Sequence, residues 1–166
     1  SVSERIPQFA FSPSYPLPAV VELAHINQWA PIQFELFNAL IQEMSINSKW
    51  QEVDAIIAID ARGFLIAPAL AIKLNKPLIV ARKPGKLPGE TVEKTYKLEY
   101  GTNNLSIQKS SLDKFSKFGV VDDLLATGGT VNCIKNILHS LKKEIKLLSV
   151  VIELSNLKGR DLFDFP

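Results

Sequence analysis

The chain has 166 residues, of which 46% are hydrophobic and 22% are charged. This length and composition are typical of a soluble domain with a continuous core, so we expect residues 1–166 to form a single domain. The net charge of +2 is too small to indicate a nucleic-acid-binding surface. No apolar run approaches the ~20 residues that a membrane span needs, so we expect no membrane partner.

The cysteine content bears on the compartment. Cys133 is the one cysteine of the chain and has no partner for an internal disulfide, which favours a reducing compartment. The N-terminus carries no basic segment followed by an apolar one, so we expect no secretory signal. Together these features predict a cytoplasmic protein.

The first half of the chain alternates between strand and helix patterns. Residues 1–30 are rich in proline and lack periodicity, which predicts an irregular N-terminal arm. A helix is expected from Pro31, because apolar residues then recur at three- and four-residue spacing. Residues 53–59 form a nearly continuous apolar run, typical of a strand buried on both sides. A short apolar helix over 64–74 and a second buried strand over 77–80 follow.

The second half continues this alternation after an irregular stretch. Residues 82–95 combine proline, glycine and charge without a hydrophobic period, which predicts a loop. Alternating apolar residues on either side of 101–104 predict an antiparallel hairpin with its turn there. Residues 118–121 predict a third buried strand, 131–142 a helix and 147–154 the last main strand. The sequence therefore predicts an α/β fold, a mostly parallel twisted sheet flanked by helices.

The segment 120–130 carries the strongest functional signal. Asp122 and Asp123 follow an apolar strand, and a small, glycine-rich loop, Thr127 to Thr130, precedes the next helix. The backbone N–H groups of such a loop, with the helix N-terminus behind it, bind phosphate. Two carboxylates beside an anion site repel it unless they bind something else, such as sugar hydroxyls or a magnesium shell. The segment therefore predicts a sugar-phosphate site.

This segment resembles the 5-phosphoribosyl-1-pyrophosphate (PRPP) signature of type I phosphoribosyltransferases. Three further segments, in the same order, resemble the adenine branch of that family. Residues 60–64, Asp-Ala-Arg-Gly-Phe, resemble its pyrophosphate loop, residues 82–101 its mobile flap, and residues 153–160 its late strand and turn. The resemblance implies the family's fold, with an N-terminal hood over residues 1–30 and a flap hairpin. Within the hood, residues 20–23 depart from the family's Phe-Arg-Asp pattern.

The resemblance also implies a reaction. Adenine displaces pyrophosphate from C1 of PRPP, giving AMP, in purine salvage. Asp122 and Asp123 are expected to accept hydrogen bonds from the ribose hydroxyls and to stabilise the cationic transition state. Glu99 is the expected acid/base for the purine. Magnesium is expected to be chelated by PRPP itself, with Asp122 and Asp123 as the open alternative for protein ligands.

The remaining implied contacts form three groups. The 5-phosphate group comprises Leu125, Ala126, Thr127, Gly128, Gly129 and Thr130. The pyrophosphate group comprises Ala61, Arg62, Gly63, Arg82, Lys83, Lys86 and Tyr100, with Arg62 also counted as catalytic. The weaker adenine group comprises Val20, Val21, Leu124, Ala126 and Leu157. The resemblance further implies a non-proline cis peptide, expected at Ala61–Arg62. It also implies a homodimer in which Arg82 reaches toward the neighbouring site.

Two alternatives remain open at this stage. A regulatory domain of this family binds PRPP without chemistry and tends to lose the flap lysines and the acid/base, whereas this chain keeps Lys83, Lys86 and Glu99. An enzyme for hypoxanthine, guanine or xanthine presents a lysine to the exocyclic oxygen shortly after the PRPP loop. Lys135 falls inside the following helix and Lys158 in the late turn, which favours adenine.

Overall fold

A computed structural model describes the backbone of residues 34–98 and 101–166 of the chain. It describes the side chains of residues 34–95 and 104–166. Several predictions lie outside these described residues. They concern the N-terminal arm, the helix start at Pro31, the base contacts Val20 and Val21, and the flap residues Glu99 and Tyr100. Within the described ranges, no helix has both the length and the apolar character needed to cross a membrane.

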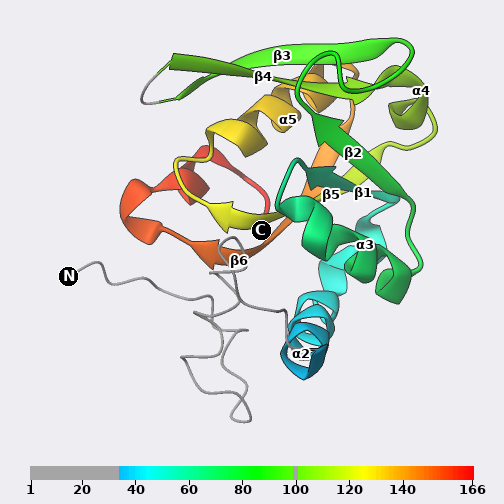
Figure 1. The fold of residues 1–166 in the computed structure, drawn as a ribbon, viewed down its shortest axis with the longest axis vertical. Coiled ribbons are helices and arrows are strands. Elements are labelled where there is room, and N and C mark those ends of the chain that lie inside the picture. The colour runs from blue at the N-terminus through cyan, green and yellow to red at the C-terminus, as the bar shows by residue number, and fades with distance from the viewer. Residues whose placement is uncertain (1–33, 99–100) are drawn as a thin grey trace.

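The described residues form a six-stranded sheet with the order β3-β4-β2-β1-β5-β6 (Figure 1). The strands are β1 Ala55–Ile59, β2 Leu78–Arg82, β3 Thr91–Leu98, β4 Gly101–Gln108, β5 Lys117–Leu125 and β6 Glu144–Glu153. β1, β2, β5 and β6 are parallel neighbours, while the β3–β4 hairpin joins antiparallel at the β2 edge. The predicted α/β fold with a mostly parallel sheet is therefore confirmed.

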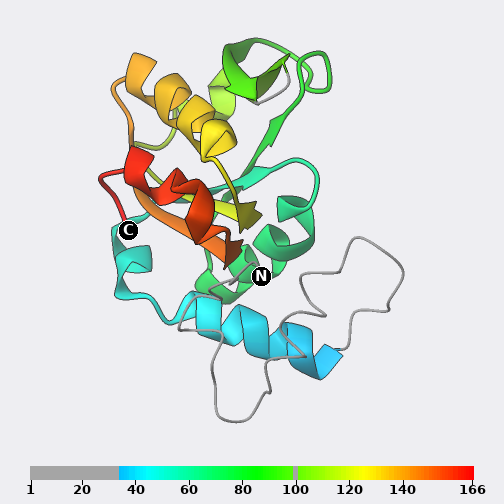
Figure 2. The same ribbon diagram turned by 90° about the vertical axis from the view of Figure 1, so that its left-hand side faces the viewer.

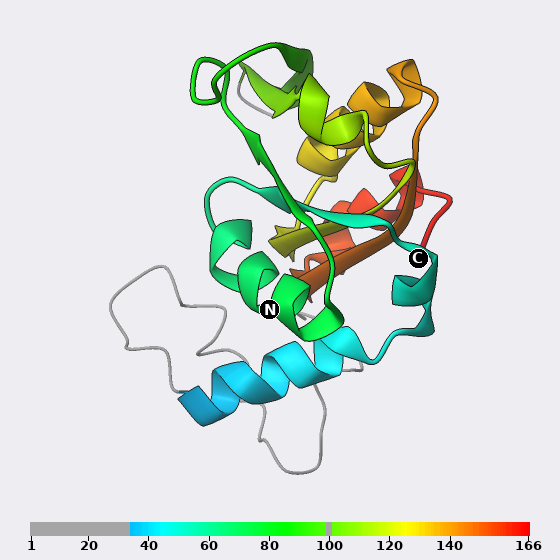
Figure 3. The same ribbon diagram turned by 90° about the vertical axis from the view of Figure 1, so that its right-hand side faces the viewer.

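Helices cover both faces of this sheet (Figures 2 and 3). The helices are α2 Phe34–Ser45, α3 Gly63–Leu74, α4 Lys109–Leu112 and α5 Gly129–Ser140, with 3-10 turns η2 Ser48–Glu52, η3 Ser155–Leu157 and η4 Gly159–Leu162. α3 packs on β1 and β5, and α2 packs outside α3. α5 packs on β3, β4 and β6. The helices that follow β1 and β5 thus lie on opposite faces.

The continuous apolar run of β1 explains how the two faces are built. Ile57 and Ile59 lie in the core under α5, whereas Ile56 and Ala58 lie in the core under α2 and α3. All five residues of β1 are buried, because a parallel strand with helices on both faces has no solvated side. This burial fixes the strand at the centre of the sheet, where the loop after it faces the loop after β5.

The structure corrects two boundaries around the flap. β3 begins at Thr91 and pairs with Gln108, so the loop predicted over 82–95 is confined to 83–90. Glu93 and Lys94 are exposed, and charges on a solvated edge strand hide the alternating pattern. The turn predicted at 101–104 was also wrong, because Gly101 already pairs with Leu98 in the hairpin.

A third correction concerns the acid pair. β5 extends to Leu125, paired with Glu153 of β6, so Asp122 and Asp123 lie within the strand instead of after it. Aspartate is depleted in strands, and pairing with β6 overrides that preference here. The backbone that carries both carboxylates is consequently held by the β5–β6 hydrogen-bond ladder and does not belong to a loop.

Candidate active site

The candidate site lies at the carboxyl ends of the central strands. β1 and β5 are parallel neighbours, and the chain leaves β1 toward α3 on one face and β5 toward α5 on the other. Open α/β sheets bind ligands at such a point, because the two loops diverge and leave a crevice between them. Residues 60–63 after β1 and 126–128 after β5 form the two sides of this crevice.

Arg62 and Asp123 meet across it. The Nε atom of Arg62 donates to Oδ2 of Asp123 at 2.5 Å, although 61 positions separate them in the chain. Gly63 permits this approach, because a Cβ atom there would lie 2.8 Å from the carbonyl oxygen of Val121. The structure therefore brings the predicted pyrophosphate loop and the predicted acid pair into direct contact.

The backbone of the loop after β1 has one unusual peptide. The non-proline cis bond joins Asp60 to Ala61. The predicted position, Ala61–Arg62, was therefore wrong by one residue. Arg62 itself has helical dihedral angles at the start of α3, because its backbone already belongs to the turn that begins that helix.

The two carboxylates of the acid pair have different environments. Oδ1 of Asp122 accepts a hydrogen bond from the backbone N–H of Asp123 at 2.9 Å. Burial raises the pKa of Asp122 from 3.8 to about 7, and the neighbouring Asp123 carboxylate adds to the increase while Arg62 opposes it. Oδ1 of Asp123 is buried and has no hydrogen-bond partner within the described part of the chain. Each acid therefore retains capacity for a ligand.

The loop between β5 and α5 has the geometry expected of a phosphate loop. Gly128 has φ of +79°, a conformation that glycine adopts without strain, and it turns the chain into α5. Among the described residues no side chain caps the first turn of α5, so its N–H groups are available to an anion. Thr127 is exposed and Thr130 half-buried, whereas the Leu125 side chain is 2% exposed and packs in the core.

Arg82 ends β2 and lies beside the loop after β1. Its Nε atom donates to Oδ2 of Asp60 at 3.0 Å, and its guanidinium carbon lies 5.9 Å from the centre of the Phe64 ring. Lys83 and Lys86 are exposed in the loop 83–90 that follows. The flap segment that carries the three predicted cations therefore starts next to the pyrophosphate loop. Arg82 is held there by Asp60 and Phe64.

The adenine group is only partly described. Leu124 is half-buried in β5 opposite Ile152 of β6, and Ala126 is half-buried just after that strand. Leu157 is 41% exposed in η3, which follows β6. The described members of the group therefore come from the ends of adjacent strands, at the same edge as the acid pair.

No dedicated metal cage accompanies these residues. Across residues 34–98 and 101–166, no group of three or more His, Cys, Asp or Glu side chains is placed to hold a metal ion. Asp122 and Asp123 are the pair of carboxylates at the crevice. A magnesium ion brought by a polyphosphate ligand needs few protein ligands, and this donor set fits such an ion better than an all-protein site.

Four residues with contacts at this edge were not assigned roles from the sequence. Asp60 and Phe64 hold Arg82, and Glu153 and Arg160 form an ion pair in the turn after β6. Asp60 and Phe64 belong to the segment 60–64 that resembles the pyrophosphate loop, so that resemblance could have indicated a role for them. Glu153 and Arg160 stand at the two ends of the segment 153–160, which resembles the family's late strand and turn, but that resemblance did not indicate that the two side chains pair.

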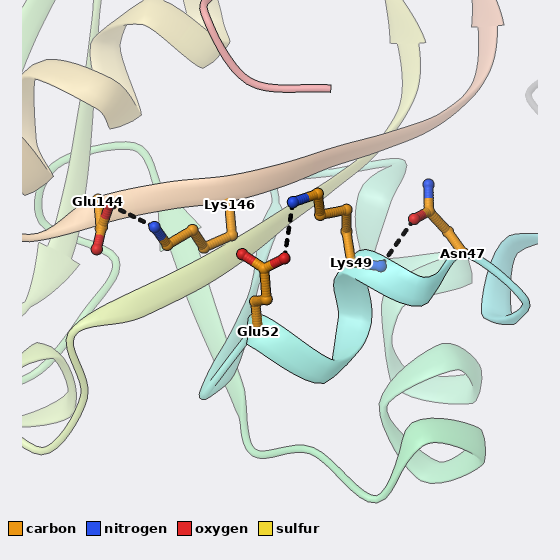
Figure 4. Close-up of polar contacts among 5 residues, drawn as sticks. All are labelled: Asn47, Lys49, Glu52, Glu144 and Lys146. Carbon is orange, nitrogen blue, oxygen red and sulfur yellow. Dashed lines mark hydrogen bonds and ion pairs between the residues drawn. The ribbon is translucent and has the colours of Figure 1, made fainter.

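A hollow of about 360 Å³ lies at the opposite edge of the sheet, lined in part by η2, α5 and the start of β6. Two ion pairs lie in its lining, Lys49 with Glu52 at 2.7 Å and Lys146 with Glu144 at 2.7 Å (Figure 4). Lys143, which also lines it, donates to the carbonyl oxygen of Phe115. Lys135 likewise pairs with Asp164 at 3.1 Å. Paired charges offer little to an anionic ligand, so the crevice between β1 and β5 remains the candidate site.

Comparisons with known proteins agree with this geometry. Residues 26–161 match the phosphoribosyl transferase domain, the class that the sheet order and the acid–glycine loop indicate. An adenine phosphoribosyltransferase from Prochlorococcus marinus is 54% identical over 132 residues, which are 80% of this chain and 77% of the relative. One from Halothermothrix orenii is 46% identical over 127 residues, covering 76% of this chain and 75% of the relative.

Solved structures give the same result. The Saccharomyces cerevisiae adenine phosphoribosyltransferase, in complex with adenine and an imino-altritol bisphosphate, has a TM-score of 0.73 and 33% identity, over 81% of this chain and 78% of that one. The Thermoanaerobacter pseudethanolicus enzyme has a TM-score of 0.73 and 38% identity, over 79% of this chain and 77% of that one. The chain belongs to the phosphoribosyltransferase family and, within it, to the adenine phosphoribosyltransferases.

Proposed function

We propose that the chain transfers the 5-phosphoribosyl group from PRPP to adenine, giving AMP and pyrophosphate in purine salvage. The observation that carries the proposal is the contact between Arg62 and Asp123, 2.5 Å apart, at the crevice where β1 and β5 end. This contact joins a cation for the leaving group to an anion for the sugar. The identity of 54% to an adenine phosphoribosyltransferase supports adenine as the base.

The 5-phosphate and ribose contacts follow from this site. The backbone N–H groups of residues 126–130 and the hydroxyls of Thr127 and Thr130 bind the 5-phosphate, aided by the uncapped N-terminus of α5. Asp122 and Asp123 accept hydrogen bonds from the two ribose hydroxyls. The buried Oδ1 of Asp123 supports this role, because an unpaired buried oxygen gains most from a donor that the ligand supplies.

The pyrophosphate contact requires an exchange of partners. Arg62 pairs with Asp123 in the chain alone, so PRPP must supply pyrophosphate oxygens to Arg62 and a hydroxyl to Asp123 in place of that pair. The loop amides of Ala61 and Gly63 take part beside it. Arg82, Lys83 and Lys86 add charge from the flap, with Tyr100 supporting its closed form.

Magnesium fits this arrangement as a group that PRPP brings with it. Bound to pyrophosphate oxygens, it shares the neutralisation of the leaving group. Asp122 and Asp123 are the described carboxylates that would lie nearest to it. The chain's own task is to hold the ribose and the 5-phosphate in place while pyrophosphate departs.

The base would lie between aliphatic residues. Leu124, Ala126 and Leu157 form one side in this proposal, with Val20 and Val21 of the N-terminal arm on the other. Glu99 on the flap hairpin handles the purine proton, which makes the attacking nitrogen a better nucleophile. The adenine found in the related Saccharomyces cerevisiae structure supports a base site in this fold.

We further propose a cytoplasmic homodimer. Leu65, Pro68 and Ile72 form an apolar stripe on the outer side of α3, and Leu65 and Ile72 are 46% and 84% exposed. An exposed apolar stripe is typical of a protein–protein contact. α3 begins at Gly63, directly after Arg62, so a partner packed on α3 would come close to the crevice, where Arg82 is proposed to reach toward the neighbouring site.

The test is product formation from PRPP and magnesium with adenine, hypoxanthine, guanine and xanthine in turn. We expect AMP from adenine and far slower turnover of the oxo-purines. Lys135, a candidate for contacting an oxo group, is paired with Asp164. Preference for an oxo-purine would contradict the assignment of the base. PRPP binding without turnover of any of the four bases would identify a regulator instead.

A further inference from the structure

The turns after β6 lie against the back of the proposed phosphate loop (Figure 2). A Cβ atom added to Gly159 would overlap the carbonyl oxygen of Ala126 and would lie 2.9 Å from the backbone nitrogen of Gly128. Conversely, a Cβ atom on Gly128 would lie 2.8 Å from the carbonyl oxygen of Gly159. The two backbones are therefore in direct contact, and a shift of Gly159 toward the loop would displace it.

An ion pair holds this turn. Glu153, the last residue of β6, accepts from Nε of Arg160 at 3.1 and 3.0 Å and from Nη2 at 2.6 Å. The Glu153 side chain is 17% exposed and the Arg160 side chain 56%, so the carboxylate is fixed in the fold while water reaches the guanidinium. Bidentate Arg–carboxylate pairs fix direction as well as distance. The pair thus closes the segment 153–160 into a loop of defined shape.

The other end of this pair is tied to the strand that carries the acid pair. Glu153 lies opposite Leu125 in the β5–β6 ladder, and the backbone N–H of Leu154 donates to the Leu125 carbonyl oxygen at 2.8 Å. Leu125 is also the residue from which the phosphate loop begins. Glu153 is therefore fixed to one end of the phosphate loop. Its ion-pair partner, Arg160, directly follows Gly159, and Gly159 contacts the middle of the same loop.

We propose that Glu153 and Arg160 are positioning residues for the 5-phosphate: their ion pair holds Gly159 against residues 126–128 and fixes the phosphate-binding amides. This proposal rests on the proposed role of the loop in binding the 5-phosphate. Neither side chain contacts the ligand in this account. Their effect is preorganisation, since a loop that is already ordered loses less freedom when it binds.

The test uses Arg160→Ala and Glu153→Gln in the full chain, with binding of ribose 5-phosphate and of pyrophosphate with magnesium measured by calorimetry. We expect the Kd for ribose 5-phosphate and the KM for PRPP to rise by about 10-fold or more, because small misplacements of binding groups are costly. The Kd for pyrophosphate should change much less, because its proposed contacts lie in the loop after β1 and in the flap, outside residues 126–128 and 153–160. The double variant should be no worse than either single one, because both remove the same pair.

Two further variants separate positioning from stability. Arg160→Lys should recover only part of the affinity, because an ammonium lacks the planar fork of the guanidinium. Lys49→Ala breaks the exposed Lys49–Glu52 pair at the far edge of the sheet and should leave both ligand affinities unchanged. Thermal melting of every variant shows the folded fraction at the assay temperature.

Wild-type affinity for ribose 5-phosphate in Arg160→Ala and Glu153→Gln would overturn the proposal. So would a loss that follows the folded fraction and weakens pyrophosphate binding equally, since the pair would then be a stability contact alone. The loop's own role is checked separately with Thr127→Ala and Thr130→Val. Unchanged ribose 5-phosphate affinity in those variants would contradict the proposed function of the loop. It would not contradict the effect of the ion pair on the shape of the loop.

Discussion

Asp122 makes the free energy of unfolding depend on pH in an uncommon direction. The folded chain keeps the Asp122 proton up to a pKa of about 7, whereas the unfolded chain releases it near 3.8. Between these values the folded state binds more protons, so the stability from Asp122 is fully present below pH 3.8 and is lost as pH rises through about 7. In the proposed site, the same ionisation would prepare the carboxylate to accept hydrogen bonds from ribose hydroxyls.

Urea unfolding at pH 5 and pH 8 checks this. We expect the wild-type chain to lose more stability than Asp122→Asn over that interval, because the amide does not ionise. Parallel changes in the two proteins would contradict the raised pKa. The dependence of the unfolding free energy on urea concentration must have the same slope in both proteins, since a changed slope reports a different unfolded state.

Glu99 is the residue that separates an enzyme from a PRPP-binding protein. If Glu99 handles the purine proton, Glu99→Gln should bind PRPP as well as the wild type while kcat falls by about 100-fold or more. The amide has the same shape but accepts no proton. Steady-state rates with adenine, together with PRPP binding, provide the measurement. Unchanged turnover would move the acid/base role to another residue.

At the scale of elements, the flap loop has little to hold it. Gly85 and Gly89 have positive φ, and nothing lies within 4 Å of the Cβ position of either. The side chain of Gln108 donates to the Pro88 carbonyl oxygen at 2.8 Å, at the end of the loop nearest β4. Such a loop is able to move without disturbing the sheet.

We therefore expect PRPP with magnesium to protect the chain from trypsin at Lys86. Closure over the ligand would bury that position, because the flap lysines would face pyrophosphate. Lys142, in the exposed turn after α5, serves as the control site and should be cut at the same rate in both conditions. Equal cleavage at Lys86 with and without PRPP would count against closure.

The elements that the sequence predicted well have patterns that their own residues determine. The apolar run of 53–59 became β1 over Ala55–Ile59, because burial on both faces demands such a run. The last strand begins earlier than predicted, at Glu144, where half-buried Lys146 alternates with buried Ile145 and Leu147. Edge and ladder effects, as in β3 and the end of β5, depend on neighbouring strands that a local pattern does not show.

At the scale of the whole molecule, the candidate site likewise combines parts that a local sequence pattern predicts with parts that only the fold brings together. The segment from Asp122 to Thr130 was predictable because its strand, loop and helix are contiguous in the chain. The resemblance supplied the loop at 60–63, and the fold brings Arg62 to Asp123. The support from Gly159 was not predictable, because the close approach of two backbone segments leaves no side-chain pattern.

The proposed dimer can be tested on α3. Ile72→Glu places a charge in the apolar stripe, so we expect it to shift the chain from dimer to monomer in light scattering at micromolar concentration. Ile46→Glu is the matched control, because Ile46 is 71% exposed and lies just beyond α2, off the stripe. A fully active wild-type monomer would contradict both the dimer and the reach of Arg82.

The proposed reaction depends most on the acid pair, Asp122 and Asp123, near the end of β5. AMP formation from PRPP and adenine by the double variant Asp122→Asn with Asp123→Asn tests it directly, with circular dichroism to confirm the fold. We expect turnover to fall by at least about 100-fold while the fold survives, because preorganised charge beside the developing cation is removed. Near-normal turnover in a folded double variant would contradict the sugar-binding role of both aspartates and the location of the site.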